Sequence, residues 1–337
     1  MLQLARTVVV CLATAYCVAD SVCGASDREP RTLIVARDGS GEYRSIQEAV
    51  DAAGRGDTIR IKAGEYQEDV TIHSKDGLHL IGDRVDQVKI LGLNRVGSFH
   101  IGKWPYGATN IEISGMTIQE HGGLAVGIFN GRDIVLHDMT IHGMVFGQQV
   151  QRVRIEDSRI GGSETTGIQF ADSDAVLSGN VIHDNDHGVT VAGKSTVRVE
   201  RNVIVHNLFE AVVITDSAKA LVVSNTIVKN GGGIAFLQRA EGEVTGNVIG
   251  LNKIGVLIAP TSRPMLSYNA LDNSEQNYAF TGSPPIPAPQ LKGETDLTVE
   301  PRFVDSGRDD FRLRADSALL GVGRFPYLGA LPPAALH

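Results

Sequence analysis

The sequence predicts an all-β fold, a parallel β-helix in which three short strands form each coil and a short helix covers the N-terminal end. Three observations carry this prediction: a repeat close to 22 residues long, an alternation of apolar and polar residues within each repeat, and two columns of evenly spaced asparagines. A repeat of this length is typical of solenoids, in which each unit buries its apolar face against its neighbours.

The repeat occurs seven times between Gly127 and Asn273. Apolar residues alternate with polar ones in three short runs of each unit, for example at 188–191, 197–199 and 202–204. Such alternation predicts strands, and the turns lack the Asn-Gly or Asp-Gly pair of a tight hairpin, so each strand is expected to pair in parallel with its equivalent one coil away. The units begin at Gly127, Gly147, Gly167, Gly188, Ala211, Gly233 and Gly255, in steps of 20, 20, 21, 23, 22 and 22 residues.

Two columns of asparagine accompany the repeat. Amides stacked one coil apart can bond one another, and asparagine tolerates the left-handed backbone of a tight turn. A ligand site rarely repeats one residue in every coil, so we interpret both columns as structural. The first contains Asn180, Asn202, Asn225, Asn247 and Asn269, and the second Asn185, Asn207, Asn230, Asn252 and Asn273.

The ends of the chain differ from the repeat. The capping box at 45–48 opens an amphipathic run from Ile46 to Ala53, which predicts a helix over the open apolar end of the first coil. The proline-rich run at 284–289 ends the repeat. We therefore predict a signal peptide at 1–25, an N-terminal cap segment at 32–57, the β-helix at 58–283, and a proline-rich linker with an irregular C-terminal cap at 284–337.

The N-terminal 25 residues have the pattern of a signal peptide, with one basic residue, an apolar stretch, and small residues at Ala19 and Ala25 as alternative cleavage points. The three cysteines lie within it, so a cleaved chain has no disulfide, thiol nucleophile or cysteine metal ligand. A lipid anchor at Cys17 or Cys23 is the alternative. We expect a secreted or periplasmic monomer without a membrane span after cleavage.

The net charge of −8 argues against nucleic acid as a partner.

A family resemblance adds to this reading. The segment 35–43, with 46–50, 56–59, 63–68 and 80–82, resembles the opening of pectin methylesterases and of other right-handed β-helix proteins in the pectate-lyase-like superfamily. The repeat region resembles polyuronate lyases, C5-epimerases and the periplasmic copper-site maturation proteins of the nitrous oxide reductase system. The resemblance implies a right-handed helix and a polysaccharide ligand. Esterase activity is not expected, because no aspartate precedes 146–149 and Arg263-Pro264 is followed by Met265.

In such enzymes the substrate groove follows the outer face of the first strand of each coil, so this resemblance implies a polysaccharide groove there. The residues expected to point outward on that face are Gln149, Gln169, Thr190, Val213, Ala235 and Leu257. The polar ones, Gln149, Gln169 and Thr190, together with Arg239 at one edge, are the candidate substrate-binding residues.

One edge of this face is rich in imidazole and carboxylate. His183, Asp186 and His187 lie in the turn that enters one first strand, and neighbouring coils are about 4.8 Å apart. Imidazole beside carboxylate could act as a general acid/base pair or hold a metal. The alternative is an ordinary solvated turn. Residues on the neighbouring coils that could join this cluster are His142, Glu164, His206 and Glu210.

The opposite edge alternates in charge from coil to coil, with Arg152, Asp172, Asp174, Lys194, Asp216 and Arg239. A polyuronate lyase or C5-epimerase needs a base, for which Lys194 or His187 is the candidate, and a cation that neutralises the uronate carboxylate, for which Arg152 is the candidate. Asp172, Asp174 and Asp216 are candidate Ca²⁺ ligands. A structural ladder of ion pairs is the alternative. On the second strand, Arg154 with Glu156 and Arg198 with Glu200 are interpreted as surface pairs.

The leading hypothesis is a protein that binds or acts on polysaccharide, as a polyuronate lyase or epimerase. Two alternatives remain. A non-catalytic solenoid that binds glycan or protein is favoured by the apolar residues Val213, Ala235 and Leu257 on the downstream outer face. A periplasmic copper-site maturation protein would use His142, His183, His187 and His206.

Overall fold

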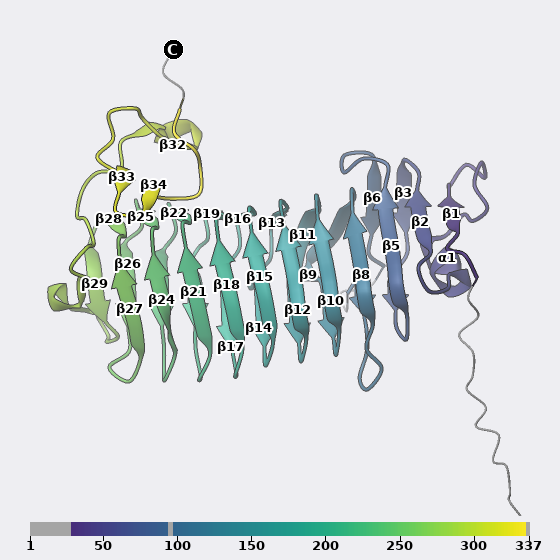
Figure 1. Ribbon diagram of the computed structural model, residues 1–337, viewed down its shortest axis with the longest axis horizontal. Coiled ribbons are helices and arrows are strands. Elements are labelled where there is room, and N and C mark those ends of the chain that lie inside the picture. The colour runs from purple at the N-terminus through teal and green to yellow at the C-terminus, as the bar shows by residue number, and fades with distance from the viewer. Residues whose placement is uncertain (1–27, 94–96, 335–337) are drawn as a thin grey trace, which may run out of the picture.

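The computed structural model describes residues 28–93 and 97–334. Its main body is a right-handed parallel β-helix extended along one axis, with a short helix at the N-terminal end and a C-terminal segment beside the other end (Figure 1). This confirms the predicted fold class. The expected signal peptide, with its cysteines and cleavage points, lies outside the described residues.

Each coil contributes three strands, as predicted, and the second strands form one parallel sheet of 11. This ladder starts before Thr58, because β1 pairs in parallel with β2. Its strands are β1 (Thr32–Val35), β2 (Thr58–Ile61), β5 (Asp76–Gly82), β8 (Thr109–Ser114), β10 (Arg132–His137), β12 (Gln151–Glu156), β15 (Asp174–Ser178), β18 (Thr196–Glu200), β21 (Lys219–Val223), β24 (Glu241–Thr245) and β27 (Arg263–Ser267).

The first and third strands form the remaining faces of the helix. β9 (Thr117–Phe129) and β11 (Thr140–Gln148) run through the corner between a third and a first strand. The first strands are β4 (Val70–Ile72), β7 (Phe99–Ile101), β14 (Thr166–Ala171), β17 (His187–Ala192), β20 (Glu210–Ile214), β23 (Gly232–Phe236), β26 (Ile254–Ile258) and β29 (Gln276–Phe280). The third strands are β3 (Gly64–Gln67), β6 (Val88–Leu91), β13 (Arg159–Gly161), β16 (Val181–His183), β19 (Val203–Val205), β22 (Thr226–Val228), β25 (Val248–Gly250) and β28 (Ala270–Asp272).

One apolar core fills the interior of the coils. Inward positions of paired strands stack in columns, as Leu80 on Ile113 and Leu177 on Val199, and all four side chains are fully buried. Full burial of such a side chain contributes roughly 1.5–3 kcal/mol. The alternation read from the sequence therefore sets which side chains face the core and which face outward.

The asparagine columns carry a hydrogen-bond ladder at the corner between second and third strands and another at the corner between third and first strands. Asn202 shows the repeated pattern: its backbone N and its Nδ2 donate to Asn225 Oδ1 at 2.9 and 3.0 Å, and its Nδ2 also donates to Leu177 O at 2.9 Å. The first ladder ends on Asp296, whose Oδ1 accepts from Asn269 N at 2.8 Å. Buried amides and carbonyls of successive turns are satisfied in this way.

The helix α1 (Ile46–Ala52) covers the first coil with Ile46, Ala49 and Val50 buried, and it ends one residue before the predicted Ala53. Beside it, the fully buried carboxylate of Asp57 accepts from Arg28 Nη1 at 2.9 Å, Arg31 N at 2.8 Å and Gly54 N at 2.9 Å. Burial raises the pKa of Asp57, but these hydrogen bonds outweigh it and hold the pKa well below its ordinary value.

This carboxylate is expected to make part of the stability acid-sensitive. A depressed folded-state pKa stabilises the fold above the unfolded value of about 4, and this contribution is lost as the pH falls through the folded-state pKa. We expect Asp57→Asn to lower the free energy of unfolding by about 2–3 kcal/mol at neutral pH and to flatten its dependence on pH below about 4. Urea denaturation at several pH values measures both. Asp51→Asn, at an exposed position of α1, is the matched control, and equal acid slopes in all three proteins would contradict the assignment.

The C-terminal segment does two things. Residues 288–297 close the last coil, with Ala288 N donating to Tyr278 O and Leu271 N to Leu297 O. The chain then lies along the outer face of the third strands, above β19 to β28 in Figure 1. The contacts here join Phe311 to Val203, Val205 and Val228, and Leu313, Leu319 and Leu328 to Val248 and Ala270. The 3-10 helices η1 (Pro289–Leu291) and η2 (Ser306–Arg308) and the strands β30 (Ile286–Pro287), β31 (Phe303–Asp305), β32 (Asp310–Leu313), β33 (Leu320–Val322) and β34 (Phe325–Tyr327) complete the segment.

Candidate functional site

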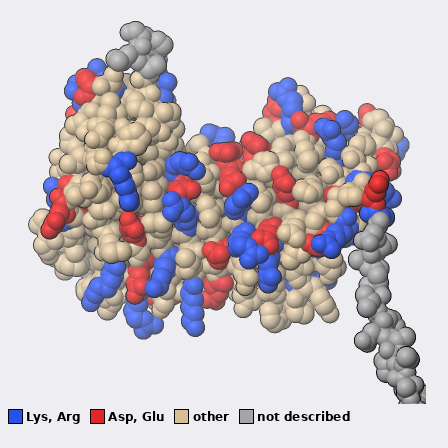
Figure 2. All heavy atoms as spheres, viewed as in Figure 1, with Lys and Arg blue, Asp and Glu red and all other residues tan. Residues whose placement is uncertain are grey.

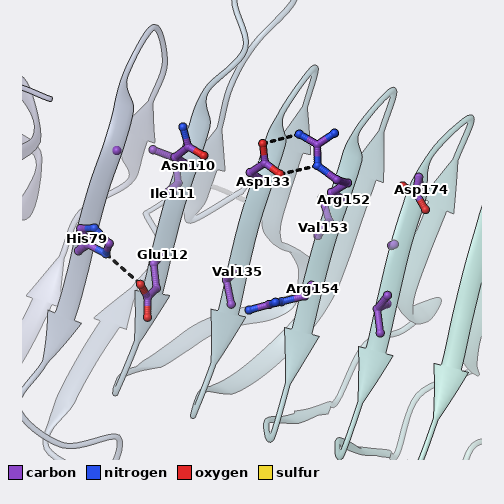
Figure 3. A pocket seen from close by; sticks show the side chains of 13 residues that line it. His79, Asn110, Ile111, Glu112, Asp133, Val135, Arg152, Val153, Arg154 and Asp174 are labelled. Carbon is purple, nitrogen blue, oxygen red and sulfur yellow. Dashed lines mark hydrogen bonds and ion pairs between the residues drawn. The ribbon is translucent and has the colours of Figure 1, made fainter. Parts of the chain in front are cut away.

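A groove runs across the outer face of the second-strand sheet. It consists of two adjoining hollows of about 570 and 670 Å³ that share Asp174, Ala175 and Val176. The first extends from β5 to β15 (Figure 3) and the second from β15 to β27, so the groove follows the solenoid axis. We call this surface the second-strand groove.

The register of the sheet determines which side chains line the groove. Outward positions stack one per coil, and aliphatic side chains alternate with charged ones over much of the column, as in Arg154, Val176, Arg198 and Leu221. Small buried residues of the adjacent inward positions, such as Ala175 and Ala220, contribute to the lining. Within the groove, this column contains His79, Glu112, Val135, Arg154, Val176, Arg198, Leu221, Glu243 and Met265.

Most charges in the groove are paired within the chain, and Figure 2 shows positive and negative side chains interleaved across this face. Arg152 donates from Nε and Nη2 to the two oxygens of Asp133, each at 2.6 Å (Figure 3). The Arg152 guanidinium holds the pKa of Asp133 below its ordinary value. Arg154 Nε lies 3.3 Å from Glu156 Oε1. Because a guanidinium has five N–H donors, these pairs leave donors for a ligand.

A chain of titratable groups lies at the N-terminal end of the groove. Glu112 accepts from both His79 and His137, with each N–O distance 2.9 Å, and His137 Nδ1 lies 2.8 Å from Asp138 Oδ2. The hydrogen bond with His137 is the main cause of a lowered pKa for Glu112. Burial lowers the pKa of His137, but its bonds with Asp138 and Glu112 outweigh this and raise it overall. Positive charge is therefore favoured on His137 here.

A smaller pocket of about 540 Å³ adjoins the groove at the turns between first and second strands. Lys194 is exposed and has no ion pair within the described part of the chain. The carboxylates on the neighbouring coils bond to the turn that carries it: Asp172 accepts from Lys194 N at 2.9 Å and Asp216 accepts from Gly193 N at 2.8 Å. Two carboxylates of the alternating charges at this edge thus bond to backbone amides. A structural ladder would instead consist of ion pairs between side chains. The pocket is lined by Gln149, Val150, Gln151, Asp172, Ser173, Asp174, Lys194 and Thr196.

The structure brings several sequence-predicted residues together and separates others. Gln149, Asp172, Asp174 and Lys194 share the edge pocket, whereas Arg152 is paired with Asp133 on the preceding coil. Gln169 and Thr190 are cross-strand neighbours on the first-strand face and are half-buried. Arg239 is exposed in the turn between β23 and β24.

The placement of Gln149 on the outward first-strand column is wrong. The residue opposite Gln169 is Phe146, and Gln149 lies in the following turn with a left-handed φ of 54°. The cause is a difference in coil length. β11 passes through its corner without a break, whereas β13 and β14 are separated by the turn at 162–165, so aligning Gly147 with Gly167 shifts the register by three residues.

The histidine-rich edge does not form one cluster. His183 Nδ1 lies 2.7 Å from Asp184 Oδ2, while His206 Nε2 lies 2.9 Å from Asp309 Oδ2 of the C-terminal segment. His187 Nδ1 is at ion-pair distance from Glu210 Oε2, 3.3 Å, but has no hydrogen-bond partner of good geometry in the described residues. Nearby, a shallow pocket of about 380 Å³ includes Asp186 together with Glu164, Asp184 and His206 in its lining.

His142 lies on the third-strand row two coils before His183, and partial desolvation is the main cause of its lowered pKa. Among the residues that the structure describes, no three His, Cys, Asp or Glu side chains converge in a way that could hold a metal ion. The same part of the chain has no helix with the length and hydropathy to span a bilayer.

Comparison with known protein families identifies the family of this chain. A family model described as periplasmic copper-binding protein (NosD) matches residues 109–284, more than half of the chain. The chain belongs to the NosD family. A second model, pectinesterase, matches residues 32–122 of this NosD-family protein, the segment whose resemblance to pectin methylesterases the sequence showed.

Curated relatives match only a part of the NosD-family chain. A probable pectinesterase/pectinesterase inhibitor 6 of Arabidopsis thaliana is 35% identical over 103 residues, which are 28% of this chain and 17% of the relative. Pectinesterase 2 of Citrus sinensis is 41% identical over 69 residues, or 19% of this chain and 13% of the relative. The chain therefore spans less than a fifth of the length of these relatives.

Solved structures share the fold of this NosD-family protein at low sequence identity. Pectate lyase Pel9A has a TM-score of 0.59 at 13% identity, with 91% of this chain and 97% of that chain covered. Alginate lyase from Paenibacillus sp. str. FPU-7 has a TM-score of 0.56 at 13% identity, with 77% and 99% covered. These similarities establish a shared β-helix fold.

The sequence of this NosD-family chain did not lead us to predict a binding site in the second-strand groove. We identified the pairs of Arg154 with Glu156 and Arg198 with Glu200, which the structure contains, but interpreted them only as surface pairs. We also missed Asp133, the partner of Arg152. The signal that could have found the groove is Val176, an apolar residue at an outward position between two arginines.

Proposed function

We propose that the protein binds an extended, uronate-containing polysaccharide in the second-strand groove. The continuity of the groove from β5 to β27 carries this proposal. Coils repeat about every 4.8 Å along the axis, and a hexose unit in an extended polymer advances by a similar length, so successive sugars would meet equivalent positions on successive coils. The groove thus supports recognition of a polymer.

The lining supplies the contacts that such a ligand needs. Arg154 and Arg198 retain free N–H donors for carboxylate and hydroxyl oxygens, while Val176 and Leu221 offer apolar surface to the C–H faces of the sugar rings. The ammonium of Lys194 at the edge, which has no ion pair among the described residues, adds a further site for a carboxylate. Since many groove charges are already paired, affinity is expected to come from many modest contacts.

The geometry favours binding over turnover. Proton abstraction from a uronate requires the base and the carboxylate-neutralising cation to reach one sugar. Arg152 is directed to Asp133, on the preceding coil, and Lys194 is two coils beyond Arg152. His187 and Lys194 lie at opposite ends of β17, roughly 20 Å apart at the rise of an extended strand.

The described residues do not fit a copper site. A stable site requires several nitrogen, sulfur or carboxylate ligands around one point, and His183, His187 and His206 are each adjacent to a different carboxylate. We therefore assign copper no role in the proposed function. The family description, which names a periplasmic protein, supports a location outside the cytoplasm, in agreement with the signal-peptide prediction.

A charge placed in the groove tests the proposal. Val176→Glu puts a carboxylate between Arg154 and Arg198, where it can pair with both, so we expect folding to be retained while the added negative charge competes for their free donors and repels uronate carboxylates. Calorimetric titration with oligogalacturonate and oligoalginate is expected to show at least about a tenfold loss of affinity, or 1.4 kcal/mol.

Thr190→Glu is the matched control, because it adds the same charge to the outer face of the first strands. It should bind as the unmodified protein does. Loss of binding in Thr190→Glu with normal binding in Val176→Glu would place the ligand on the first-strand face instead. Release of unsaturated uronates, followed by ultraviolet absorbance, would contradict the conclusion that the protein binds without turnover.

A further inference from the structure

The loop between β7 and β8 exposes two aromatic side chains. Trp104, the single tryptophan of the sequence, is 74% exposed and Tyr106 is 60% exposed. Aromatic side chains of this size are usually largely buried, because they contribute much apolar area to a core. Within the described residues, neither ring stacks on another aromatic ring.

The loop is anchored at both ends. Gly102 N donates to Ile72 O at 2.6 Å, and Gly107 O accepts from Ser74 N at 2.9 Å. A Cβ at Gly102 would lie 2.0 Å from Phe129 O, so the loop begins where two backbones approach too closely for a side chain. Between these points, Lys103 N donates to Tyr106 O at 2.7 Å and closes the tip.

The loop leads directly into a strand that lines the N-terminal part of the second-strand groove. β8 starts at Thr109, three residues after Tyr106, and Asn110 is part of the groove lining. Thr109 Oγ1 and Asn110 Nδ2 both donate to Asp76 Oδ1, at 3.0 and 2.7 Å, which ties this strand start to β5. The aromatic tip therefore precedes β8, the second strand of the groove, whose start is bonded to β5, the first strand of the groove.

We infer that Trp104 and Tyr106 form a stacking platform for a pyranose ring of the polysaccharide that lies in the groove. This inference rests on the proposed function. Among the described residues, the groove lining contains the imidazole of His79 but no Trp, Tyr or Phe, so it offers guanidinium and aliphatic contacts but no large aromatic ring face. Tryptophan and tyrosine combine a flat apolar face with a polar N–H or O–H group, which matches a sugar ring that has a C–H face and hydroxyls at its edge.

The single tryptophan makes the test direct, because all tryptophan emission comes from position 104. The protein is titrated with oligogalacturonate and oligoalginate while emission is recorded, and the same titrations are followed by calorimetry. We expect emission to shift with the midpoint that calorimetry gives. Trp104→Ala should weaken binding about tenfold, and Trp104→Phe, which keeps an aromatic ring, about twofold to threefold. Leu93→Ala, at an apolar side chain that is 62% exposed on another loop, is the control and should bind normally.

The outcomes separate this inference from the proposed function. Calorimetric binding without an emission change, or with normal affinity in Trp104→Ala, overturns the platform and leaves the groove proposal in place. Absence of calorimetric binding to either oligosaccharide overturns both. If emission does not change with the oligosaccharides but shifts with phosphatidylglycerol vesicles, the tip is a membrane contact, and this result also overturns the inference.

Discussion

Asn225→Ala is expected to lower the free energy of unfolding by about 3–5 kcal/mol, since several buried polar groups lose their partners at about 1–3 kcal/mol each. Asn225 is fully buried. Its Oδ1 accepts from Asn202 N and Nδ2 at 2.9 and 3.0 Å, and its Nδ2 donates to Val199 O at 2.8 Å and to Val223 O at 3.1 Å. Alanine replaces none of these bonds. Equilibrium urea denaturation followed by circular dichroism measures the loss.

Asn273→Ala provides the matched comparison, because Asn273 lies near the end of the second ladder and is only partly buried. Solvent can satisfy more of the groups left behind, so we expect a smaller loss, about 1–2 kcal/mol. Equal losses in the two variants would show that position within the ladder does not matter. A negligible effect of Asn225→Ala would contradict the structural interpretation of the columns.

Phe311→Ala is expected to cost about 3–5 kcal/mol, the range for removing a buried phenylalanine. Phe311 is 2% exposed and packs against Val203, Val205 and Val228, with Phe303 edge-on at a centroid distance of 5.4 Å. Its loss weakens the attachment of the C-terminal segment to the third strands. Urea denaturation reports the change in stability, and limited proteolysis reports whether the segment is released.

Phe325→Ala is the control for this variant. Phe325 belongs to the same C-terminal segment but is only partly buried, and its ring lies 6.0 Å from that of Tyr268. A loss of about 1 kcal/mol is expected, because less apolar area leaves water. If Phe311→Ala were no more destabilising and no more protease-sensitive than Phe325→Ala, the segment would not depend on this contact.

This attachment explains why the third-strand face is not open to solvent from β19 to β28. Val203, Val228 and Val248 are outward on their strands, yet they are buried by the C-terminal segment. Among the described residues, the C-terminal segment reaches the second-strand groove only at its edge, where Arg324 Nη2 lies 3.9 Å from Glu243 Oε1. The same period-2 pattern thus produces a second core on one face and a ligand-accessible groove on another.

The sequence by itself determined the repeat, the three strands per coil and the asparagine columns. These features depend on local periodicity. The alternation of apolar and polar residues determines which side chains point inward, and each coil repeats the pattern of its neighbour. It also identified a helix start at Ser45, whose side chain accepts from Glu48 N at 3.4 Å. Each of these rests on residues close together in the chain or one repeat apart.

Only the tertiary structure decided which face is open and which residues share a pocket. Variation in coil length moved Gln149 from the first-strand face to a turn, and no single glycine in the sequence marks that shift. The cover supplied by Phe311 comes from a segment about 100 residues away from Val203. Side-chain direction decided the rest: Arg152 bonds Asp133 on the preceding coil, away from Lys194, and that choice depends on cross-strand geometry that residue spacing does not encode.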